Sequence, residues 1–287
     1  DRHRLGRGAV HLPGHGGLIW EVLGAVGSEA RGVGVTVDRS IYVVGAVRVA
    51  KGPDVWDMAT WVYGPDKEAY GPDIFKDPLD KAPFTYSERG QAVVVLASGR
   101  VAVAGTREVQ DPVTKDTFLR GVVLTYEGKG KRVGEWTSSG DKMLNDSILA
   151  AAPAPSGLVL CGYAQNDVDI PANKPQILIR WFDEDLTEVK APRVEPTPGA
   201  ATCHGIGTNM EGVTIVGATV NENQSGDNAW IFTVTDAASP RVDYMKRNGI
   251  SNGQDRVLGL ACEYMCAWTG SEEVDGAAKW ISGMLRG

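Results

Sequence analysis

The feature that most constrains this chain is a short apolar run ending in glycine, which recurs along most of its length. Four runs end at Gly45, Gly105, Gly162 and Gly217, and a fifth ends at Trp268, where a tryptophan replaces the glycine. Successive runs lie 60, 57, 55 and 51 residues apart. A drifting period of this size is typical of a repeat protein in which each unit is one supersecondary structure.

Each run is flanked by further strand-like segments. A first strand is expected before each run, at residues 33–37, 92–96, 148–152, 203–206 and 257–261. The turn between the two carries Gly, Asp or Asn in most units, which predicts an antiparallel hairpin. A third strand is expected after each run, at residues 59–63, 118–126, 176–182, 229–234 and 278–285, and a fourth is clearest at residues 132–137.

Helical periodicity is nearly absent, and 36 glycines and 15 prolines favour turns over helices. The sequence therefore predicts an all-β fold, a β-propeller with five blades of four antiparallel strands each. We expect residues 17–287 to form this single domain, preceded by an N-terminal arm at residues 1–16. Because the fifth unit stops after its third strand, we expect the segment around Trp20 to close the ring by pairing with the strand around Trp280.

The blocks at residues 93–105 and 149–162, and the aromatic-acidic ends of the third strands, resemble the delta-60 repeat and the related bacterial propeller repeat of the SBBP type. The resemblance spans about residues 30–287. The chain departs from the family's pattern in several units, where the usual Asp-Gly turn is missing, as at residues 38–40. The resemblance implies a propeller in a large bacterial protein of the cell envelope or the extracellular space, without an assigned chemistry.

Composition argues against several classes of function. The 287 residues include 36 acidic and 29 basic side chains, and the net charge of −7 disfavours a nucleic-acid-binding surface. No apolar stretch reaches the roughly 18 residues of a membrane span. We expect neither a metal nor a cofactor, because the chain carries no phosphate-binding loop, dinucleotide fingerprint or standard zinc-ligand spacing.

Four cysteines allow two disulfides. Cys262 ends a first strand and Cys266 lies in the next, so a tight hairpin could set them opposite each other. Cys161 and Cys203 fall at the same end of neighbouring units. We therefore predict the pairs Cys262–Cys266 and Cys161–Cys203, and with them an oxidising compartment: extracellular, periplasmic or cell envelope. Four buried thiols that serve as small apolar residues are the alternative.

An acid precedes the first strand in four units, and an arginine follows closely in three of them. The acids are Glu29, Glu88, Asp146 and Asp255, and the arginines are Arg31, Arg89 and Arg256. Because the first strand of a propeller blade lines the central channel, these side chains could ring its mouth and hold a cation, a sugar or a peptide end. Alternatively, each acid caps backbone amides between blades, a role that the repetition itself favours.

The fourth unit breaks this pattern. Ala200 and Ala201 stand where the acid is expected, and Thr202, Cys203 and His204 follow. Adjacent residues of a strand point to opposite faces, so Cys203 and His204 are poorly placed to act as nucleophile and base. We include His204 among the candidate ligands at the channel mouth, with a packed histidine as the alternative.

These observations favour a secreted or envelope-associated propeller that acts as a non-catalytic binding or scaffolding module with a protein or glycan partner. One rival is a hydrolase or lyase that acts on a glycan through the carboxylates at the channel mouth. A glycosidase requires two carboxyl groups roughly 5–9.5 Å apart. Another rival is a structural subunit of a larger assembly.

Overall fold

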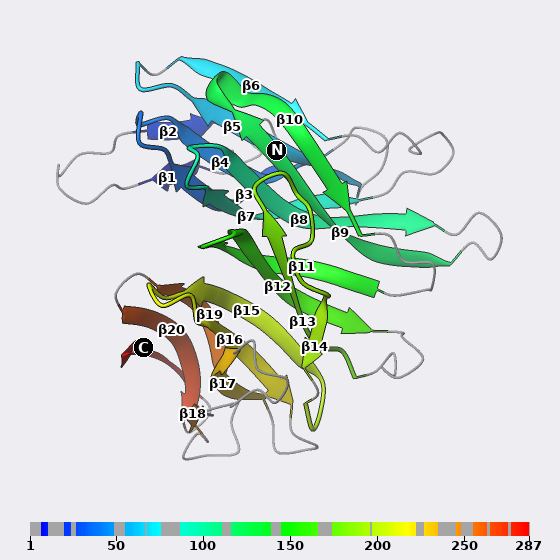
Figure 1. Ribbon diagram of the computed structural model, residues 1–287, viewed down its shortest axis with the longest axis vertical. Coiled ribbons are helices and arrows are strands. Elements are labelled where there is room, and N and C mark those ends of the chain that lie inside the picture. Colours follow the sequence, from blue (N-terminus) through cyan, green and yellow to red (C-terminus); the bar gives the residue numbers. More distant parts are fainter. Residues whose placement is uncertain are drawn as a thin grey trace, which may run out of the picture.

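The regular structure of the described residues consists of β-strands and one 3-10 turn, Gly128–Gly130. The computed structural model describes residues 7–10, 20–23, 27–48, 55–66, 68–75, 87–110, 116–138, 145–165, 174–195, 197–221, 227–234, 245–247, 255–262, 265–274 and 277–286. Five antiparallel sheets follow one another in chain order around an arc, and we number them sheets 1 to 5 (Figure 1). Within the described ranges, no helix is long and apolar enough to cross a membrane.

Every one of the five sheets is a meander whose strands pair in sequence order. Sheet 1 holds β3 (Ser28–Val35), β4 (Ile41–Arg48), β5 (Trp56–Tyr63) and β6 (Ala69–Ile74), and sheet 2 holds β7 (Glu88–Val95), β8 (Val101–Gln110), β9 (Thr117–Glu127) and β10 (Lys131–Thr137). Sheet 3 holds β11 (Asn145–Ala154), β12 (Gly157–Gln165), β13 (Gln176–Asp183) and β14 (Arg193–Glu195). Sheet 4 holds β15 (Ala201–Thr208), β16 (Thr214–Asn221), β17 (Asp227–Val234) and β18 (Met245–Arg247), and sheet 5 holds β19 (Arg256–Cys262), β20 (Met265–Val274) and β21 (Ala277–Arg286). Each segment expected from the sequence overlaps one of these strands, which confirms the all-β class.

The first strand of each sheet lies on the inside of the arc, and we call β3, β7, β11, β15 and β19 the inner strands (Figure 1). Each inner strand packs beside the next one in chain order. Apolar side chains fill the space between neighbouring sheets, as Val44, Val103 and Leu124 do between sheets 1 and 2. The core is therefore divided among the interfaces between sheets, as in a propeller.

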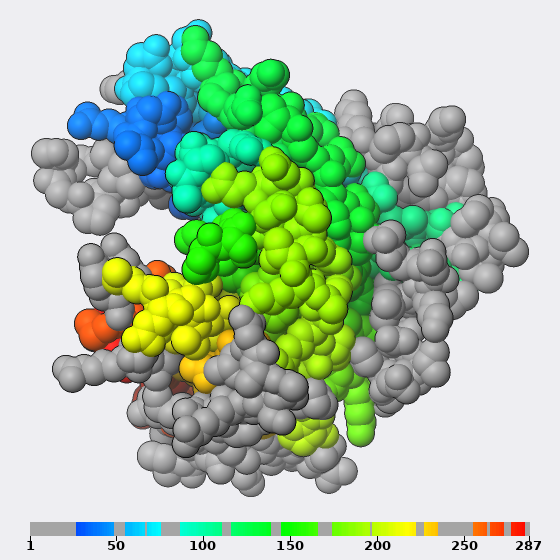
Figure 2. All heavy atoms as spheres, viewed as in Figure 1, coloured from blue at the N-terminus to red at the C-terminus, as the bar shows by residue number. Residues whose placement is uncertain are grey.

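The ring closure expected from the sequence is wrong. Trp20 lies in β2 (Trp20–Leu23), which pairs with β1 (Arg7–Val10) in a separate two-stranded sheet. Among the described strands, β21 pairs with β20 alone, and Trp280 is 80% exposed. Figure 2 shows an opening between sheet 1, in blue, and sheet 4, in yellow. The local hairpin satisfies the backbone of β2 with a nearby segment, which costs less chain entropy than a partner at the far end.

A β-bulge recurs at the same point of every inner strand. The extra residues, which we call the bulge residues, are Arg31, Gln91, Leu149, His204 and Leu258. In four sheets a glycine stands opposite the residue before the bulge: Gly45, Gly105, Gly162 and Gly270. A Cβ at Gly162 would lie 1.7 Å from the carbonyl oxygen of Ser147, which explains the recurring glycine.

This register corrects the repeat pattern in two units. In sheet 5 the equivalent glycine is Gly270, two residues beyond the Trp268 position that the sequence indicated. In sheet 4 the residue before the bulge pairs with Ala218, and Gly217 is one position out of step. The apolar runs identified the strands correctly, but their last residues did not mark equivalent positions in every unit.

Both predicted disulfides are present. Cys161 of β12 and Cys203 of β15 join sheets 3 and 4 inside a buried apolar cluster, with their Cα atoms 5.9 Å apart. Cys262 and Cys266 occupy facing positions of the β19–β20 hairpin, with their Cα atoms 4.0 Å apart. The first disulfide therefore links two sheets covalently, and the second closes a single hairpin turn.

Candidate functional site

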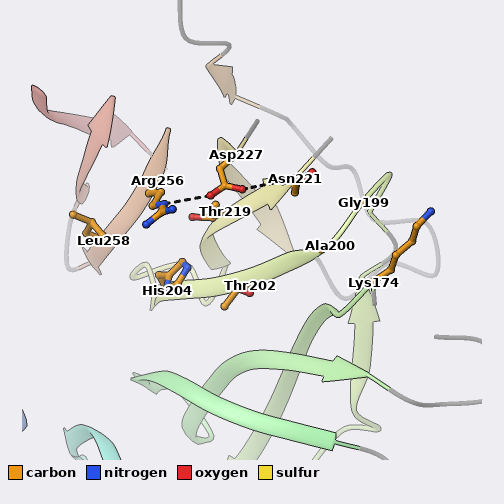
Figure 3. A pocket seen from close by; sticks show the side chains of 10 residues that line it. All are labelled: Lys174, Gly199, Ala200, Thr202, His204, Thr219, Asn221, Asp227, Arg256 and Leu258. Carbon is orange, nitrogen blue, oxygen red and sulfur yellow. Dashed lines mark hydrogen bonds and ion pairs between the residues drawn. The ribbon is translucent and has the colours of Figure 1, made fainter. Parts of the chain in front are cut away.

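A cavity of about 590 Å³ lies between sheets 4 and 5 (Figure 3). We call it the His204 pocket. Its size falls within the range of small-molecule sites. The described residues that line it are Lys174, Gly199, Ala200, Thr202, His204, Thr219, Asn221, Asp227, Arg256 and Leu258.

Strand periodicity explains how these side chains meet. Thr202 and His204 are two residues apart on β15, and Thr219 and Asn221 are two residues apart on β16. Arg256 and Leu258 repeat this spacing on β19. Because side chains alternate between the faces of a strand, each pair lies on one face. The pocket is thus lined by four strands of two neighbouring sheets, because Asp227 of β17 (Asp227–Val234) joins these pairs, and Lys174 lies at its edge beside sheet 3 (Figure 3).

An acidic side chain fixes the cationic wall of the pocket. Asp227 Oδ2 lies 3.3 Å from Arg256 Nε, and Asn221 Nδ2 donates to Asp227 Oδ1 at 3.2 Å (Figure 3). The backbone of Asp227 also accepts a hydrogen bond from Asp255 N at 2.8 Å. Asp227 is therefore tied to sheet 5 by backbone and side chain, and it orients the Arg256 guanidinium at the edge of the cavity.

Two further groups of the pocket, the His204 imidazole and the Thr219 hydroxyl, could interact with a ligand. Burial lowers the pKa of His204 below 6.5, and the nearby charge of Arg256 lowers it further, whereas Asp227 raises it. His204 is therefore neutral at pH 7 and can accept a hydrogen bond or a proton. The Oγ1 atom of Thr219 is buried without a hydrogen-bond partner in the described structure, and Thr219 is only 9% exposed. A ligand group that entered the pocket would satisfy this hydroxyl.

Three of the predicted channel residues form a second, partly exposed cluster on sheets 1 and 2. Arg31 Nε donates to Glu29 Oε1 at 3.1 Å, and Arg31 Nη1 donates to Gln91 Oε1 at 3.0 Å. Arg89 Nε lies 3.7 Å from the same Glu29 oxygen. These contacts link β3 to β7 across the inside of the arc.

The other three acids do not face the interior of the arc with Glu29. Glu88, Asp146 and Asp255 are 0%, 2% and 3% exposed, because each lies three residues before a bulge and points between sheets. Glu29 lies two residues before its bulge, on the opposite face of the strand. The structure therefore separates the acids that the sequence placed in register.

Asp146 has the capping role that the sequence analysis offered as the alternative. Its Oδ1 atom accepts hydrogen bonds from Gly121 N at 3.1 Å and from Ser138 Oγ at 2.6 Å. Its Oδ2 atom accepts one from Arg180 Nη2 at 3.0 Å. Asp146 thus joins sheet 3 to the end of sheet 2 and is not available as a catalytic acid or base.

The sequence identified His204 and Arg256 but missed Lys174, Thr219, Asn221 and Asp227. Thr219 and Asn221 follow Gly217 at a spacing of two, so strand alternation after the glycine run was the signal that pointed to them. Asp227 pairs with Asn221 across β16 and β17 within sheet 4, whereas Lys174, which precedes β13, joins the site only through the packing of sheet 3 beside sheet 4.

No family model matches the chain, and no curated protein is similar to it in sequence. The fold is similar to that of several solved structures. A protein of unknown function from Dyadobacter fermentans matches with a TM-score of 0.54 and 14% identity, over 94% of this chain and 79% of that one.

Two structures of a polysaccharide lyase, described as a family PL25 ulvan lyase, are also similar. The first matches with a TM-score of 0.54 and 8% identity, over 90% of this chain and 64% of the lyase. The second, bound to -[GlcA(1-4)Rha3S]-, matches with a TM-score of 0.51 and 7% identity, with the same coverage. The chain therefore spans less than two thirds of the lyase's length, and at these identities the likeness shows the fold alone.

Proposed function

We propose that this protein is a secreted or envelope-associated module that binds an acidic saccharide in the His204 pocket. The observation that carries the proposal is the combination, in one cavity of about 590 Å³, of two cations with a neutral imidazole and side-chain hydroxyls. The two disulfides support an oxidising compartment. A role as a scaffold within a larger bacterial envelope protein, as the repeat resemblance implies, is compatible with this binding activity.

The charges favour an anion over a neutral sugar. Lys174 and Arg256 line the cavity together with one carboxylate, Asp227, so the described lining carries a net positive charge although the whole chain is acidic. The guanidinium of Arg256 presents a planar fork that matches a carboxylate or a sulfate. Thr202 and Asn221 supply hydrogen-bonding groups suited to sugar hydroxyls. The lyase bound to -[GlcA(1-4)Rha3S]- shows that a protein of this fold can hold an acidic saccharide.

Calorimetric titration with hyaluronan or ulvan oligosaccharides, and with neutral dextran oligosaccharides, tests this proposal. The wild type should prefer the acidic ligands, and Arg256→Gln should weaken their binding by about tenfold, as expected for the loss of one charge-assisted contact. Lys131→Gln is the matched control, because it removes one positive charge from an exposed position of the outer strand β10. Equal binding of acidic and neutral oligosaccharides, or unchanged binding by Arg256→Gln, would overturn the proposal.

A second candidate function is β-elimination of a uronate, for which the neutral His204 beside Arg256 is the specific observation. Arg256 would pair with the uronate carboxylate, and His204 would take the proton from the adjacent C5. A C4–C5 double bond then forms as the C4–O bond breaks, and the departing sugar oxygen takes up a proton. A two-carboxylate hydrolase is less well supported, because Asp227 is the single carboxylate among the described residues that line the pocket.

The ultraviolet absorbance of the unsaturated product distinguishes the lyase from a binding module. A lyase should form this product at neutral pH and lose activity as the pH falls through the lowered pKa of His204, below 6.5. His204→Ala should abolish product formation while it leaves most of the binding affinity. Binding without product in the wild type would leave the non-catalytic module as the function.

A further inference from the structure

A second cavity occupies the equivalent place between sheets 2 and 3. It has a volume of about 320 Å³, and we call it the Arg89 cavity. Arg89 pairs with Thr106 across β7 and β8, just as Thr202 pairs with Thr219 across β15 and β16. Both cavities are therefore built by the same positions of the repeat.

The correspondence extends around the whole cavity. Gln91 is the bulge residue of β7, as His204 is of β15. Glu108 lies two residues beyond Thr106, as Asn221 lies two residues beyond Thr219. On the following sheet Ser147 takes the position of Arg256, two residues before the bulge. The repeat thus supplies one cavity shape twice and fills it with different side chains.

The walls of the Arg89 cavity are held in place by their neighbours. The Arg89 guanidinium lies 5.5 Å from the centre of the Trp56 ring and pairs with Glu29. Glu108 Oε2 accepts a hydrogen bond from Ser87 N at 3.1 Å. Side chains fixed in this way lose little entropy when they bind a ligand, so they are suited to recognition.

The two cavities differ in the hydrogen bonding of the threonine that lines each of them. The Thr106 hydroxyl lies 2.9 Å from Ser147 Oγ and 3.1 Å from Ile148 N, so its hydrogen bonds are made within the protein. Its counterpart Thr219 has no such partner in the described structure. The Arg89 cavity therefore has a threonine hydroxyl that is already bonded within the protein, and its lining also holds one guanidinium, one carboxylate and one amide.

We propose that the Arg89 cavity is a second saccharide subsite, which takes a neutral, hydroxyl-rich sugar unit of the same glycan that the His204 pocket holds by its acidic unit. The opposite charges of Arg89 and Glu108 offset each other, so the cavity does not select an anion. A cation and a carboxylate side by side can donate to and accept from neighbouring sugar hydroxyls. This inference rests on the proposed function of the His204 pocket.

The two subsites belong to one face of the molecule. Arg89 and Thr202 occupy the same position on their inner strands, two residues before the bulge, and β11 lies between these strands. A glycan that runs across sheet 3 on the inside of the arc reaches both cavities. Because the second contact is then intramolecular, a long ligand gains affinity that a short one does not.

Hyaluronan oligosaccharides of increasing length, in which acidic and neutral sugars alternate, test the subsite by calorimetric titration. Wild-type affinity should rise by about tenfold or more from the shortest to the longest ligand. Glu108→Gln and Arg89→Gln should remove most of this gain and leave the binding of the shortest ligand unchanged. Arg256→Gln should weaken the binding of every length, and Lys131→Gln should have no effect.

The outcomes separate the two proposals. If length brings no gain, or if the gain survives both Glu108→Gln and Arg89→Gln in proteins with the wild-type melting temperature, the subsite is wrong. The His204 pocket still stands if Arg256→Gln weakens the binding of the shortest ligand. If long ligands bind through Arg89 and Glu108 but Arg256→Gln changes nothing, the subsite stands and the proposed function of the His204 pocket is wrong. If no ligand of any length binds, both proposals fail.

Discussion

The interfaces on the two sides of sheet 3 are held together by different chemistry. Toward sheet 2, the buried carboxylate of Asp146 accepts hydrogen bonds from Gly121 and Ser138, and Arg180 caps it from its own sheet. Toward sheet 4, the position equivalent to Asp146 is Ala201, and the Cys161–Cys203 disulfide crosses the interface inside an apolar cluster. Equivalent interfaces of the repeat are therefore stabilised in two different ways, one by a buried hydrogen-bonded carboxylate and the other by a disulfide.

The difference shows that a disulfide can replace a buried carboxylate at an interface of a repeat protein. A buried carboxylate stabilises an interface only while all its partners remain, because removal of one leaves charge or polar groups uncompensated in a poorly solvated place. A disulfide makes no such demand on its surroundings and acts mainly by restricting the unfolded chain. The stability of the sheet 2–3 interface should therefore fall on single substitutions, and that of the sheet 3–4 interface should fall on addition of a reductant.

The largest effect is expected from Asp146→Ala. This change removes the more buried of the two carboxylates that pair with Arg180 and leaves it with Glu188 alone, and it removes the acceptor for Gly121 N and Ser138 Oγ. The free energy of unfolding should fall by about 4 kcal/mol, measured by urea denaturation. Asp185→Ala is the control, because Asp185 is 77% exposed in its pair with Arg100 and its loss should cost less than about 0.5 kcal/mol. Similar losses in the two variants would contradict the proposed role of Asp146.

Loss of the disulfide between sheets should come next. The double change Cys161→Ala and Cys203→Ala opens a loop with a sequence separation of 42 residues, and it should lower the free energy of unfolding by about 3–4 kcal/mol. The matched pair Cys262→Ala and Cys266→Ala opens a separation of 4 residues, and it should cost about 2 kcal/mol. Guanidinium denaturation of all three proteins checks the order. An equal or larger loss of unfolding free energy for the hairpin variant would show that the disulfide between sheets contributes no extra stability.

The interface between sheets 1 and 2 contains a half-buried carboxylate, Asp73, whose substitution should have an intermediate effect on stability. Arg132 Nε and Nη2 donate to Asp73 at 2.8 Å each, and the Tyr126 hydroxyl donates to Asp73 Oδ2 at 2.8 Å. Burial raises the pKa of Asp73, but these hydrogen bonds outweigh it and hold the pKa below its usual value. Because the folded-state pKa is depressed, Asp73 stabilises the fold at neutral pH, and this contribution is lost as the pH falls from about 4 through the folded-state value.

Asp73→Asn should therefore cost about 1–2 kcal/mol at pH 7 and less at pH 3, which lies below the pKa of the carboxyl in the unfolded chain, so that the ionised folded form has lost part of its advantage. Urea denaturation at the two pH values measures the difference. Because burial raises the pKa of Tyr126 above its usual value, its phenol stays protonated and keeps donating over this range. If the loss of unfolding free energy is the same at both pH values, Asp73 stabilises the fold through packing and not through its charge.

The smallest effect is expected from Glu29→Gln. Glu29 bridges Arg31 and Arg89 on the inside of the arc, where the three side chains are 29% to 41% exposed. Exposed ion pairs contribute little, so the free energy of unfolding should change by less than about 0.5 kcal/mol. A loss comparable to that of Asp146→Ala would show that this cluster stabilises the contact between sheets 1 and 2 and is not part of a binding surface.

Much of the fold could be read from local patterns, because a strand and its hairpin depend on nearby residues. The hairpin that places Cys262 opposite Cys266 is such a case, and its prediction is confirmed. The closure by Trp20 failed because it joined the two ends of the chain, where no local rule selects the partner strand. The delta-60 resemblance gains no support from the solved structures that share this fold, and it stays a prediction.

The sequence by itself determined the five-unit repeat, the strands of each unit and the pairing of the cysteines. Only the tertiary structure decided which side chains share a surface. Glu29 and Asp146 look equivalent in the sequence, but a difference of one position relative to the bulge places the first on the inside of the arc and the second between sheets. Because side chains alternate along a strand, a shift of one residue exchanges a solvent-facing group for a buried one. The His204 pocket depends on the same rule, since its residues come from separate strands that are brought together by pairing within sheet 4 and by the packing of sheets 3 and 5 against it.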